Sequence, residues 1–174
     1  MSDVGQVLLA RAEQLGALLA RDRLVLTTAE SCTAGGIAYA VTQVPGSSAW
    51  FDRGFITYSD DAKRQLLGVT PSYLRDFGAV SEPVARAMAL GALSHSQAQI
   101  AVAVTGIAGP GGATESKPVG TVCFAWGIRR DDHALPWVRT AQRHVDGDRA
   151  TVRAHSIVAA LDGLIALLQQ RQDV

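Results

Sequence analysis

The sequence predicts an α/β fold, a three-layer α/β/α sandwich built on a mixed, mostly parallel sheet. Short apolar runs of strand length alternate along the chain with segments whose apolar residues recur at helical spacing. One run, Ile100–Val104, is apolar at every position, as expected of a central strand that helices cover on both faces. The 174 residues are enough for one well-buried core and short for two, so we expect a single domain over residues 1–174.

The first half of the chain is expected to alternate between helices and strands. Apolar residues from Val4 to Leu19 recur at three- and four-residue steps with charges between them, and Pro45-Gly46 and Gly68 supply helix stops. The expected elements are a helix over 4–19, a strand over 24–28, a helix from after Ser31 to about 44, a strand over 55–58, a helix over 60–67 and a turn at 70–72.

The second half continues the alternation and ends in a long helix. Ser81 is a candidate helix cap, and Pro83 suits the first turn that follows it. The polar stretch 129–132 separates two β-rich runs, which predicts an antiparallel hairpin. The expected elements are a helix over 81–94, a strand over 100–104, strands over 119–128 and 135–143, and a closing helix marked by apolar residues from 157 to 168.

The composition disfavours several kinds of partner and site. Sixteen basic residues balance sixteen acidic ones, so the total charge gives no support to nucleic-acid binding. Cys32 and Cys123 lie far apart and the four histidines are scattered, so we expect neither a metal nor a cofactor. No uninterrupted apolar run approaches the roughly 20 residues that span a bilayer, and no secretory signal is visible, so we expect a cytoplasmic protein without membrane contact.

Ser31 is placed at a strand-to-helix turn, because the apolar run from Leu24 gives way there to small polar residues and glycines, AESCTAGG. A hydroxyl at a helix start lies beside unpaired backbone N–H groups that can hold a phosphate or a developing oxyanion. Serine is also an ordinary helix cap. From this segment alone Ser31 is either a cap or a functional residue, whereas its neighbour Cys32 is better explained by packing than as a nucleophile.

Two further loops follow predicted strands, where ligands bind in open α/β sheets. The loop Thr105–Ala113 has four glycines in seven residues, which lets backbone approach a ligand, although it fits no standard phosphate loop and is open to a purely structural interpretation. Lys63 lies about one helical turn beyond Tyr58 and is either a solvated surface charge or a base in a cleft. As a base it needs its pKa lowered from roughly 10.4 toward 7 by burial or nearby positive charge.

The segment before the closing helix, Asp146-Gly147-Asp148-Arg149, supplies another candidate. Asp148 is placed to cap the helix, and Arg153 follows Arg149 four residues later on the same helix face. Arg149 either pairs with an acid or reaches a ligand phosphate through its forked donors.

Five motifs in order carry a resemblance to a known family: AESCTAGG, YSDDAK, GAVSEP, TGIAGPGG with KPVGTV, and GDR before the last helix. Together they resemble the competence-damage-inducible (CinA) C-terminal family over about Leu24–Leu168, without the N-terminal domain of longer relatives. The resemblance implies the activity of the family's stand-alone members. That activity is hydrolysis of nicotinamide mononucleotide to nicotinic acid mononucleotide and ammonia, in pyridine nucleotide recycling.

The resemblance also implies roles for individual residues. Ser31 is expected to attack the amide carbon, neutral Lys63 to accept and later return its proton, and backbone N–H groups at the helix start to hold the oxyanion. Tyr58 would orient this pair or bind the ligand, and Glu30 would either bind the sugar or tie down the turn. The expected substrate-binding residues are Glu30, Cys32, Thr33, Thr105, Gly106, Gly109 and Arg149.

Two positions depart from the family pattern, and other functions stay open. Ala34 stands where glycine is common, and Asp60, where asparagine is frequent, adds a negative charge near the expected phosphate site. The alternatives are a nucleotide-binding regulatory module of the same fold, a DNA-associated protein, which the neutral charge disfavours, and a metal-dependent amidohydrolase. The expected partner is the small nucleotide substrate, and we expect a homo-oligomer.

Overall fold

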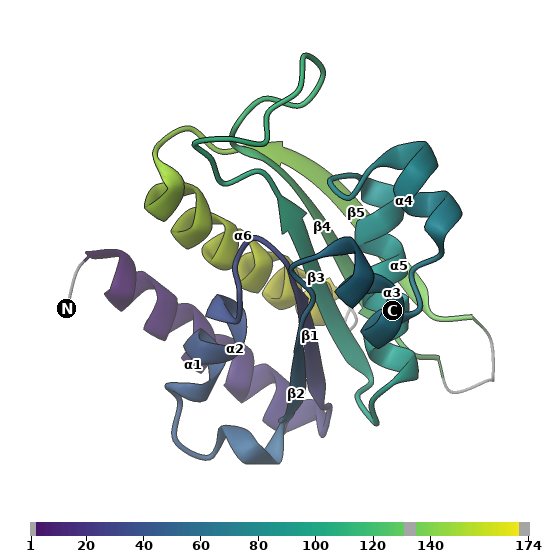
Figure 1. Cartoon of the computed structure of the whole chain (residues 1–174). Helices are drawn as coiled ribbons and strands as arrows, with labels where there is room; N and C mark the ends of the chain where they lie inside the picture. The colour runs from purple at the N-terminus through teal and green to yellow at the C-terminus, as the bar shows by residue number, and fades with distance from the viewer. Residues whose placement is uncertain (1–2, 131–134, 171–174) are drawn as a thin grey trace.

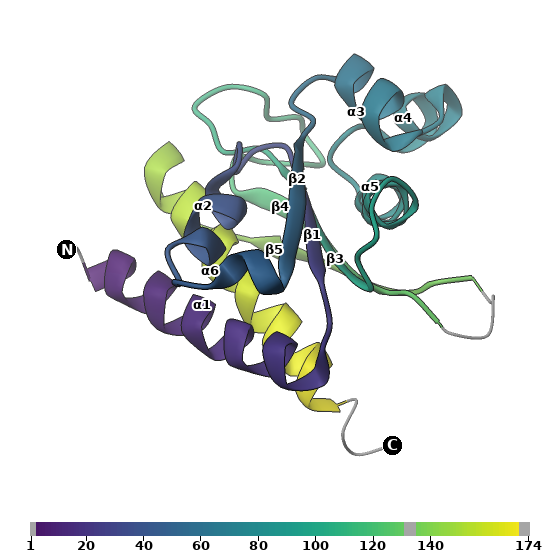
Figure 2. The ribbon, with the colours of Figure 1, turned by 90° about the horizontal axis from the view of Figure 1, so that it is seen from below.

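The chain folds into the three-layer α/β/α arrangement that the sequence predicts. The computed structural model describes residues 3–130 and 135–170. Figure 1 shows the described chain, and Figure 2, seen from below, shows the sheet between two groups of helices. One group contains α1, Asp3–Asp22, α2, Gly36–Thr42, and α6, Arg149–Gln170. The other group contains α3, Asp60–Leu67, α4, Pro71–Phe77, and α5, Glu82–Ser94.

The described residues form a five-stranded sheet in the order β2-β1-β3-β4-β5. Strand β1 is parallel to both of its neighbours, and β4 is antiparallel to both of its own, so four of these five strands share one direction. The prediction of a mixed, mostly parallel sheet is confirmed. The strands are β1, Leu26–Glu30, β2, Phe51–Ile56, β3, Ile100–Gly106, β4, Thr121–Ile128, and β5, Trp137–His144.

Helix α2 begins later than expected. The helix expected directly after Ser31 starts at Gly36, because residues 31–35 form turns. Ala34 and Gly35 both have positive φ, of 50° and 87°, and two such residues in succession cannot belong to a right-handed helix. Ser31 therefore lies in the predicted strand-to-helix turn between β1 and α2, but the helix begins five residues after it rather than directly after it.

Other differences concern element ends and two short helices, α4 and a 3-10 helix, η1, at Ser47–Ala49. Strand β2 ends at Ile56, before Tyr58, and β3 continues through Gly106. The sequence predicts only a turn at 70–72, whereas Thr70 caps α4 by accepting the Tyr73 N–H group at 3.4 Å. Strands β4 and β5 form the predicted antiparallel hairpin. Residues 131 and 132 of its expected turn lie outside the described residues.

Two helix caps lie where the sequence predicts them. Ser81 Oγ accepts the Val84 N–H group at 3.3 Å and starts α5. Asp148 Oδ1 accepts the Thr151 N–H group at 2.8 Å and starts α6. The backbone hydrogen bond from Thr151 lowers the pKa of Asp148, as expected of a carboxylate at a helix N-terminus.

Helix α6 is the most buried helix of its layer and packs against the centre of the sheet. Trp126 of β4 donates from Nε1 to the Ala160 carbonyl at 3.0 Å, and Gly163 leaves room for the indole ring. By length and mean hydropathy α6 is able to cross a membrane, but 61% of its apolar stretch is buried inside the fold. Its hydrophobicity is therefore explained by core packing.

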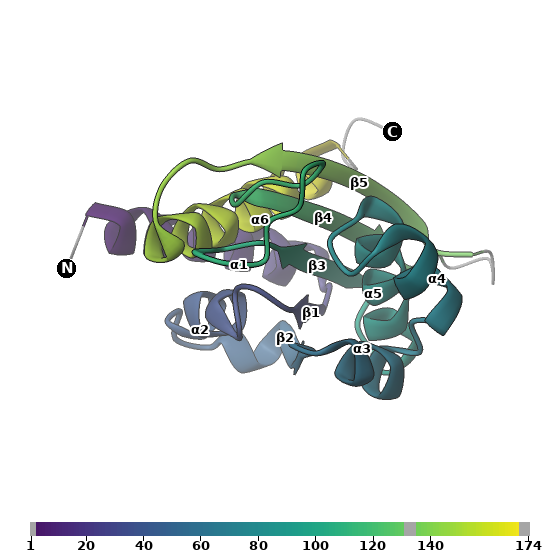
Figure 3. The same ribbon diagram turned by 45° about the horizontal axis from the view of Figure 1, so that its top comes forward.

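The register of the parallel strands brings three loops together. Glu30 at the end of β1 pairs with Ile56 of β2 and with Val104 of β3. The chain segments that follow these positions, beginning at Ser31, Thr57 and Thr105, therefore emerge at one edge of the sheet. Figure 3, which brings the top of the molecule forward, shows the loops at this edge.

Candidate active site

A serine and a lysine from different elements meet at this edge of the sheet. Lys63 Nζ lies 3.2 Å from Ser31 Oγ. Lys63 is 1% exposed and Ser31 is 8% exposed, so their contact is nearly shielded from solvent. Ser59 Oγ accepts the Ala62 N–H group and fixes the start of α3, which determines where Lys63 enters the site. The two loops therefore bring together residues 32 positions apart in the sequence.

The Lys63 amine is buried among hydrogen-bond acceptors. Its Nζ also contacts two carbonyl oxygens, that of Thr57 at 2.9 Å and that of Tyr58 at 3.5 Å. Burial lowers the pKa of Lys63 below its ordinary value, against smaller raising effects of Asp60 and Cys32. The direction of this shift is the one that a general base requires at neutral pH.

Ser31 and Lys63 line a cleft of about 200 Å³. Seven of the ten expected site residues line it: Ser31, Cys32, Tyr58, Lys63, Thr105, Gly106 and Arg149. The other residues of its wall are Asp60, Ala79, Val80 and Ala108. Three expected site residues, Glu30, Thr33 and Gly109, do not line this cleft.

Glu30 is buried behind the cleft and binds the start of α2. Its two carboxylate oxygens accept the N–H groups of Ile37 and Ala38, each at 2.9 Å, and the Thr28 hydroxyl lies 3.3 Å from one of them. The structure therefore places Glu30 where it ties down the turn, the second of its two expected roles. Because Glu30 occupies these N–H groups, the expectation that the helix start holds an oxyanion is wrong.

The turn that carries Ser31 offers other donors. The Ser31 N–H group donates to the Val104 carbonyl at 2.9 Å, and the Ala34 N–H group donates to the Ser31 carbonyl at 3.0 Å. In the described part of the chain, the N–H groups of Cys32 and Thr33 donate to no other residue. Cys32 also lines the cleft, so its N–H group is the candidate donor to a ligand oxygen, whereas Thr33 is fully buried and lies outside the cleft wall.

Cys32 is a neutral, packed thiol. Burial raises its pKa to about 11, an effect that Glu30 adds to and that Arg153 and Lys63 oppose. A Cβ atom at Gly106 would lie 3.1 Å from Cys32 Sγ and 2.9 Å from Val122, so the glycine permits this close approach. Packing therefore explains Cys32 better than nucleophilic chemistry does.

Arg149 joins two of the loops at the cleft. Its Nη2 donates to the Tyr58 hydroxyl and its Nη1 to the Gly109 carbonyl, both at 2.8 Å. Within residues 3–130 and 135–170 no acid forms an ion pair with Arg149, so the structure does not show the first of its two expected roles. Gly109 itself faces a neighbouring hollow of about 430 Å³ on the other side of Arg149.

The segment 77–80 has no role predicted from the sequence, although Ala79 and Val80 line the cleft. Thr105 Oγ1 donates to the Ala79 carbonyl at 2.8 Å, so the segment is fastened to the end of β3. Gly78 has a φ of 75° and precedes the Ser81 cap. The motif GAVSEP contained this signal, a glycine-dependent turn before a capped helix.

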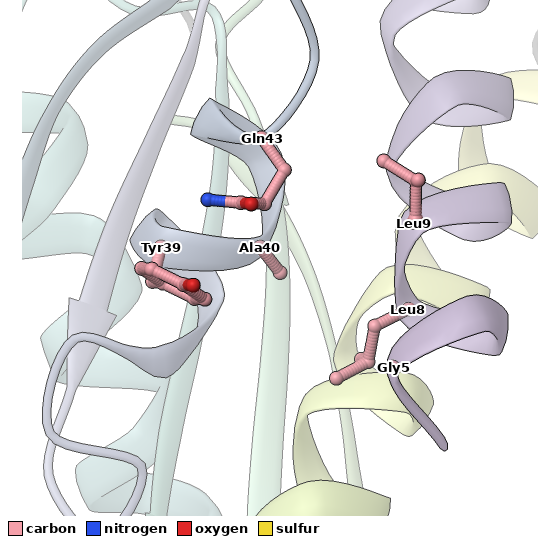
Figure 4. Close-up of a pocket in the computed structure, with 6 residues that line it drawn as sticks. All are labelled: Gly5, Leu8, Leu9, Tyr39, Ala40 and Gln43. Carbon is pink, nitrogen blue, oxygen red and sulfur yellow. The ribbon is translucent and has the colours of Figure 1, made fainter. Parts of the chain in front are cut away.

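A second hollow lies between α1 and α2, away from these groups (Figure 4). Leu8 points from α1 toward α2 in this view. The residues around the hollow are Gly5, Leu8, Leu9, Tyr39, Ala40 and Gln43, none of which is a serine, lysine, histidine or acid. Among the described residues no three histidine, cysteine or acidic side chains are grouped to hold a metal ion.

Known proteins resemble this chain in sequence and in fold. The CinA C-terminal domain matches residues 9–168. The nicotinamide-nucleotide amidohydrolase PncC of Pseudomonas putida is 51% identical over 156 residues, covering 90% of this chain and 94% of the relative. PncC of Escherichia coli K12 is 46% identical, covering 90% of this chain and 92% of the relative. The crystal structure of the competence/damage inducible protein CihA of Agrobacterium tumefaciens is 45% identical with a TM-score of 0.85, covering 92% of this chain and 95% of that one.

The match over nearly the whole chain, in sequence and in fold, shows that this chain belongs to the CinA C-terminal domain family.

Proposed function

We propose that this protein is a nicotinamide-nucleotide amidase that uses Ser31 and Lys63 to hydrolyse the carboxamide of nicotinamide mononucleotide. The observation that carries the proposal is the 3.2 Å contact between Ser31 Oγ and the buried Lys63 Nζ within the cleft. The relatives from Pseudomonas putida and Escherichia coli are named for hydrolysis of a nicotinamide nucleotide, which supports the substrate class. The product is nicotinic acid mononucleotide, an intermediate of pyridine nucleotide recycling.

The contacts of Lys63 are compatible with a hydrogen bond from the Ser31 hydroxyl to the amine, the direction that a nucleophile and its base require. A neutral amine has two N–H groups and one lone pair. When the N–H groups donate to the carbonyls of Thr57 and Tyr58, the lone pair is left for the Ser31 hydroxyl. Ser31 then donates its hydrogen bond to Lys63, and the serine proton has an acceptor before the attack begins.

The proposed reaction has two halves. Ser31 Oγ bonds to the carboxamide carbon while Lys63 Nζ takes the hydroxyl proton, and the amide oxygen gains negative charge that the Cys32 N–H group would bind. Each such donor is worth about 3 kcal/mol of transition-state stabilisation. The C–N bond then breaks as Lys63 returns the proton to the leaving nitrogen, which departs as ammonia. Lys63 then takes a proton from water, the resulting hydroxide attacks the acyl-Ser31 carbon, and the proton passes from Lys63 to Ser31 Oγ as the ester C–O bond breaks and the acid leaves.

Arg149 is the proposed phosphate ligand. Its two acceptors in the structure, the Tyr58 hydroxyl and the Gly109 carbonyl, are neutral oxygens. A phosphate offers ionised oxygens in a geometry that matches the guanidinium fork, and such bonds are roughly twice as strong. Tyr58, released from Arg149, would orient the substrate, and Thr105 and Gly106 in the wall of the same cleft would contact the ribose.

The test is ammonia release from nicotinamide mononucleotide, with the acid product identified by mass spectrometry. Ser31→Ala and Lys63→Ala are each expected to lower kcat by about a thousandfold or more while circular dichroism stays unchanged. Ser116→Ala and Arg64→Ala, both at exposed positions, serve as controls with parental rates. Near-parental turnover in Ser31→Ala or Lys63→Ala would overturn the proposed pair. Saturable binding by the parent without turnover would instead favour a regulatory nucleotide-binding module.

A further inference from the structure

Helix α6 begins with two arginines on one face, and each reaches a different loop of the site. Arg149 contacts Tyr58 and Gly109, as described above. Arg153, one turn further along, donates from Nη2 to the Thr33 carbonyl at 3.2 Å, across 120 positions of sequence. Arg153 lies outside the wall of the cleft, so its contact with the site passes through the turn that carries Ser31.

The Thr33 carbonyl is a junction of this turn. It accepts the Gly36 N–H group at 3.0 Å as well as the Arg153 guanidinium, so both of its lone pairs are used. Thr33 is fully buried, and Gly36, the first residue of α2, contacts Thr33 on one side and would clash with Ile157 of α6 if it carried a Cβ atom. Arg153 therefore holds the turn from the α6 side, while Glu30 holds it from the α2 side.

The junction is built at a cost to stability. Three buried side-chain atoms in the described residues lack a hydrogen-bond partner, and two of them, Arg153 Nε and Thr33 Oγ1, belong to the two residues of this contact. A buried polar atom without a partner costs about 1–3 kcal/mol, which an apolar side chain would avoid. A guanidinium in this place is better explained by its action on the site than by its contribution to folding.

The charge of Arg153 also reaches the residue beside the serine. Its positive charge acts on the Cys32 thiol in the sense that favours a negative group there. The tetrahedral intermediate of the proposed reaction places its negative oxygen close to Ser31 and to the Cys32 N–H group that follows it. Arg153 therefore acts on this site in two ways, by fixing the turn and by favouring negative charge near it.

We propose that Arg153 is a positioning residue of the amidase. From α6 it holds the Thr33 carbonyl, so that the turn keeps Ser31 Oγ against Lys63 and keeps the Cys32 N–H group available to the oxyanion. This inference rests on the proposed function and assigns Arg153 no direct contact with the substrate.

The test compares Arg153→Met and Arg153→Lys with Arg86→Met. Arg86 also donates to a backbone carbonyl, that of Val138, but lies on α5 away from the cleft. Arg153→Met is expected to lower kcat about 100-fold with KM within about threefold of the parent, because a misplaced nucleophile slows chemistry more than binding. Arg153→Lys, which keeps the charge and one donor, regains part of the loss, and Arg86→Met keeps the parental kcat. An unchanged kcat in Arg153→Met, or a rise in KM alone, would overturn the inference.

Amide hydrogen exchange separates this inference from the proposed function. Exchange at Ala34 and Gly36 is expected to rise about tenfold in Arg153→Met, because the turn opens locally, while α5 exchanges as in the parent. Should the parent release no ammonia, the proposed function fails, and the exchange rates still show whether Arg153 holds the turn. Unchanged exchange at both amides would show that it does not.

Discussion

The Glu30 carboxylate accepts the Ile37 N–H group at 2.9 Å, so a buried acid closes the start of α2 from behind the cleft. Its other oxygen accepts the Ala38 N–H group. Two charge-assisted hydrogen bonds and the positive end of the helix dipole compensate for the burial of the carboxylate. The turn that carries Ser31 is therefore supported on one side by a capped helix and on the other by Arg153.

Substitution of Glu30 by glutamine tests this cap. Glutamine keeps the shape but offers one carbonyl oxygen to two N–H groups and has no charge. The free energy of unfolding, measured by urea denaturation, is expected to fall by about 1–3 kcal/mol. Glu115→Gln, at an exposed position, is the control and is expected to change little. Equal stabilities for Glu30→Gln and the parent would contradict the role of the carboxylate.

Ala34 carries backbone strain that glycine would relieve. Its φ of 50° lies in the left-handed region, which costs an alanine about 1 kcal/mol more than a glycine. Because glycine also gains freedom in the unfolded chain, Ala34→Gly is expected to stabilise the protein by a net amount of about 0.5 kcal/mol in urea denaturation. Ala38→Gly, inside α2, should lower stability by about 1 kcal/mol. The interpretation is wrong if the two substitutions change stability in the same direction.

The contact between α6 and β4 depends on Gly163. A Cβ atom there would lie 2.2 Å from the Trp126 ring, and the indole is held by its bond to Ala160 and by stacking on Phe124 at 5.5 Å. Gly163→Ala is expected to lower the free energy of unfolding by about 1–3 kcal/mol. Gly111→Ala, whose Cβ would meet no atom within 4 Å, is the matched control. Equal denaturation midpoints for both variants would refute this packing argument.

The pH dependence of the activity follows from Lys63. The proposed mechanism needs a neutral amine, so kcat/KM is expected to rise with pH through the Lys63 pKa, which burial places below the ordinary 10.5. The Asp60 carboxylate raises this pKa. Asp60→Asn should therefore shift the rise to lower pH and make the enzyme several-fold faster on its acid side. Asp61→Asn, one position along α3, is the control, and a pH–rate profile that responds equally to both substitutions would count against Asp60.

The same lowered pKa predicts how stability varies with pH. Lys63 binds its proton more weakly in the folded state than in the unfolded state, so between the folded pKa and 10.5 the unfolded chain holds more protons. Folded stability therefore rises with pH across that window. The difference in unfolding free energy between the parent and Lys63→Met should grow in favour of the parent as pH approaches 10.5. A difference that is flat or falls with pH would contradict burial of an ionisable amine.

The local elements of this fold were predictable from the sequence. Apolar spacing located the central strand at Ile100 and the long closing helix, and the caps at Ser81 and Asp148 were recognisable because the capping side chain lies within three residues of the N–H group that it accepts. The resemblance to the family supplied Ser31 and Lys63 as a pair. The expected homo-oligomer and the cytoplasmic location stay predictions.

The wrong predictions concern contacts between residues that lie several or many positions apart in the sequence. The start of α2 was placed too early because small polar residues after Ser31 suit a helix cap, whereas Glu30 folds back to cap the helix seven positions later. The hydrogen bond from Arg153 to the Thr33 carbonyl joins residues 120 positions apart, and no local sequence pattern predicts it. Sequence spacing reports which residues share a helix face, but only the packed sheet determines which loops meet.

Helix α6 has its N-terminal end at the candidate active site and its remaining length in the core. Arg149 and Arg153 occupy its first two turns, and its later residues pack against Trp126 of β4. Because a helix moves largely as one body, a loss of packing at its C-terminal end would also displace both arginines. Mild heating or a distant core substitution should therefore inactivate the enzyme before the chain unfolds. The residual turnover then measures how well the helix keeps its position against the sheet.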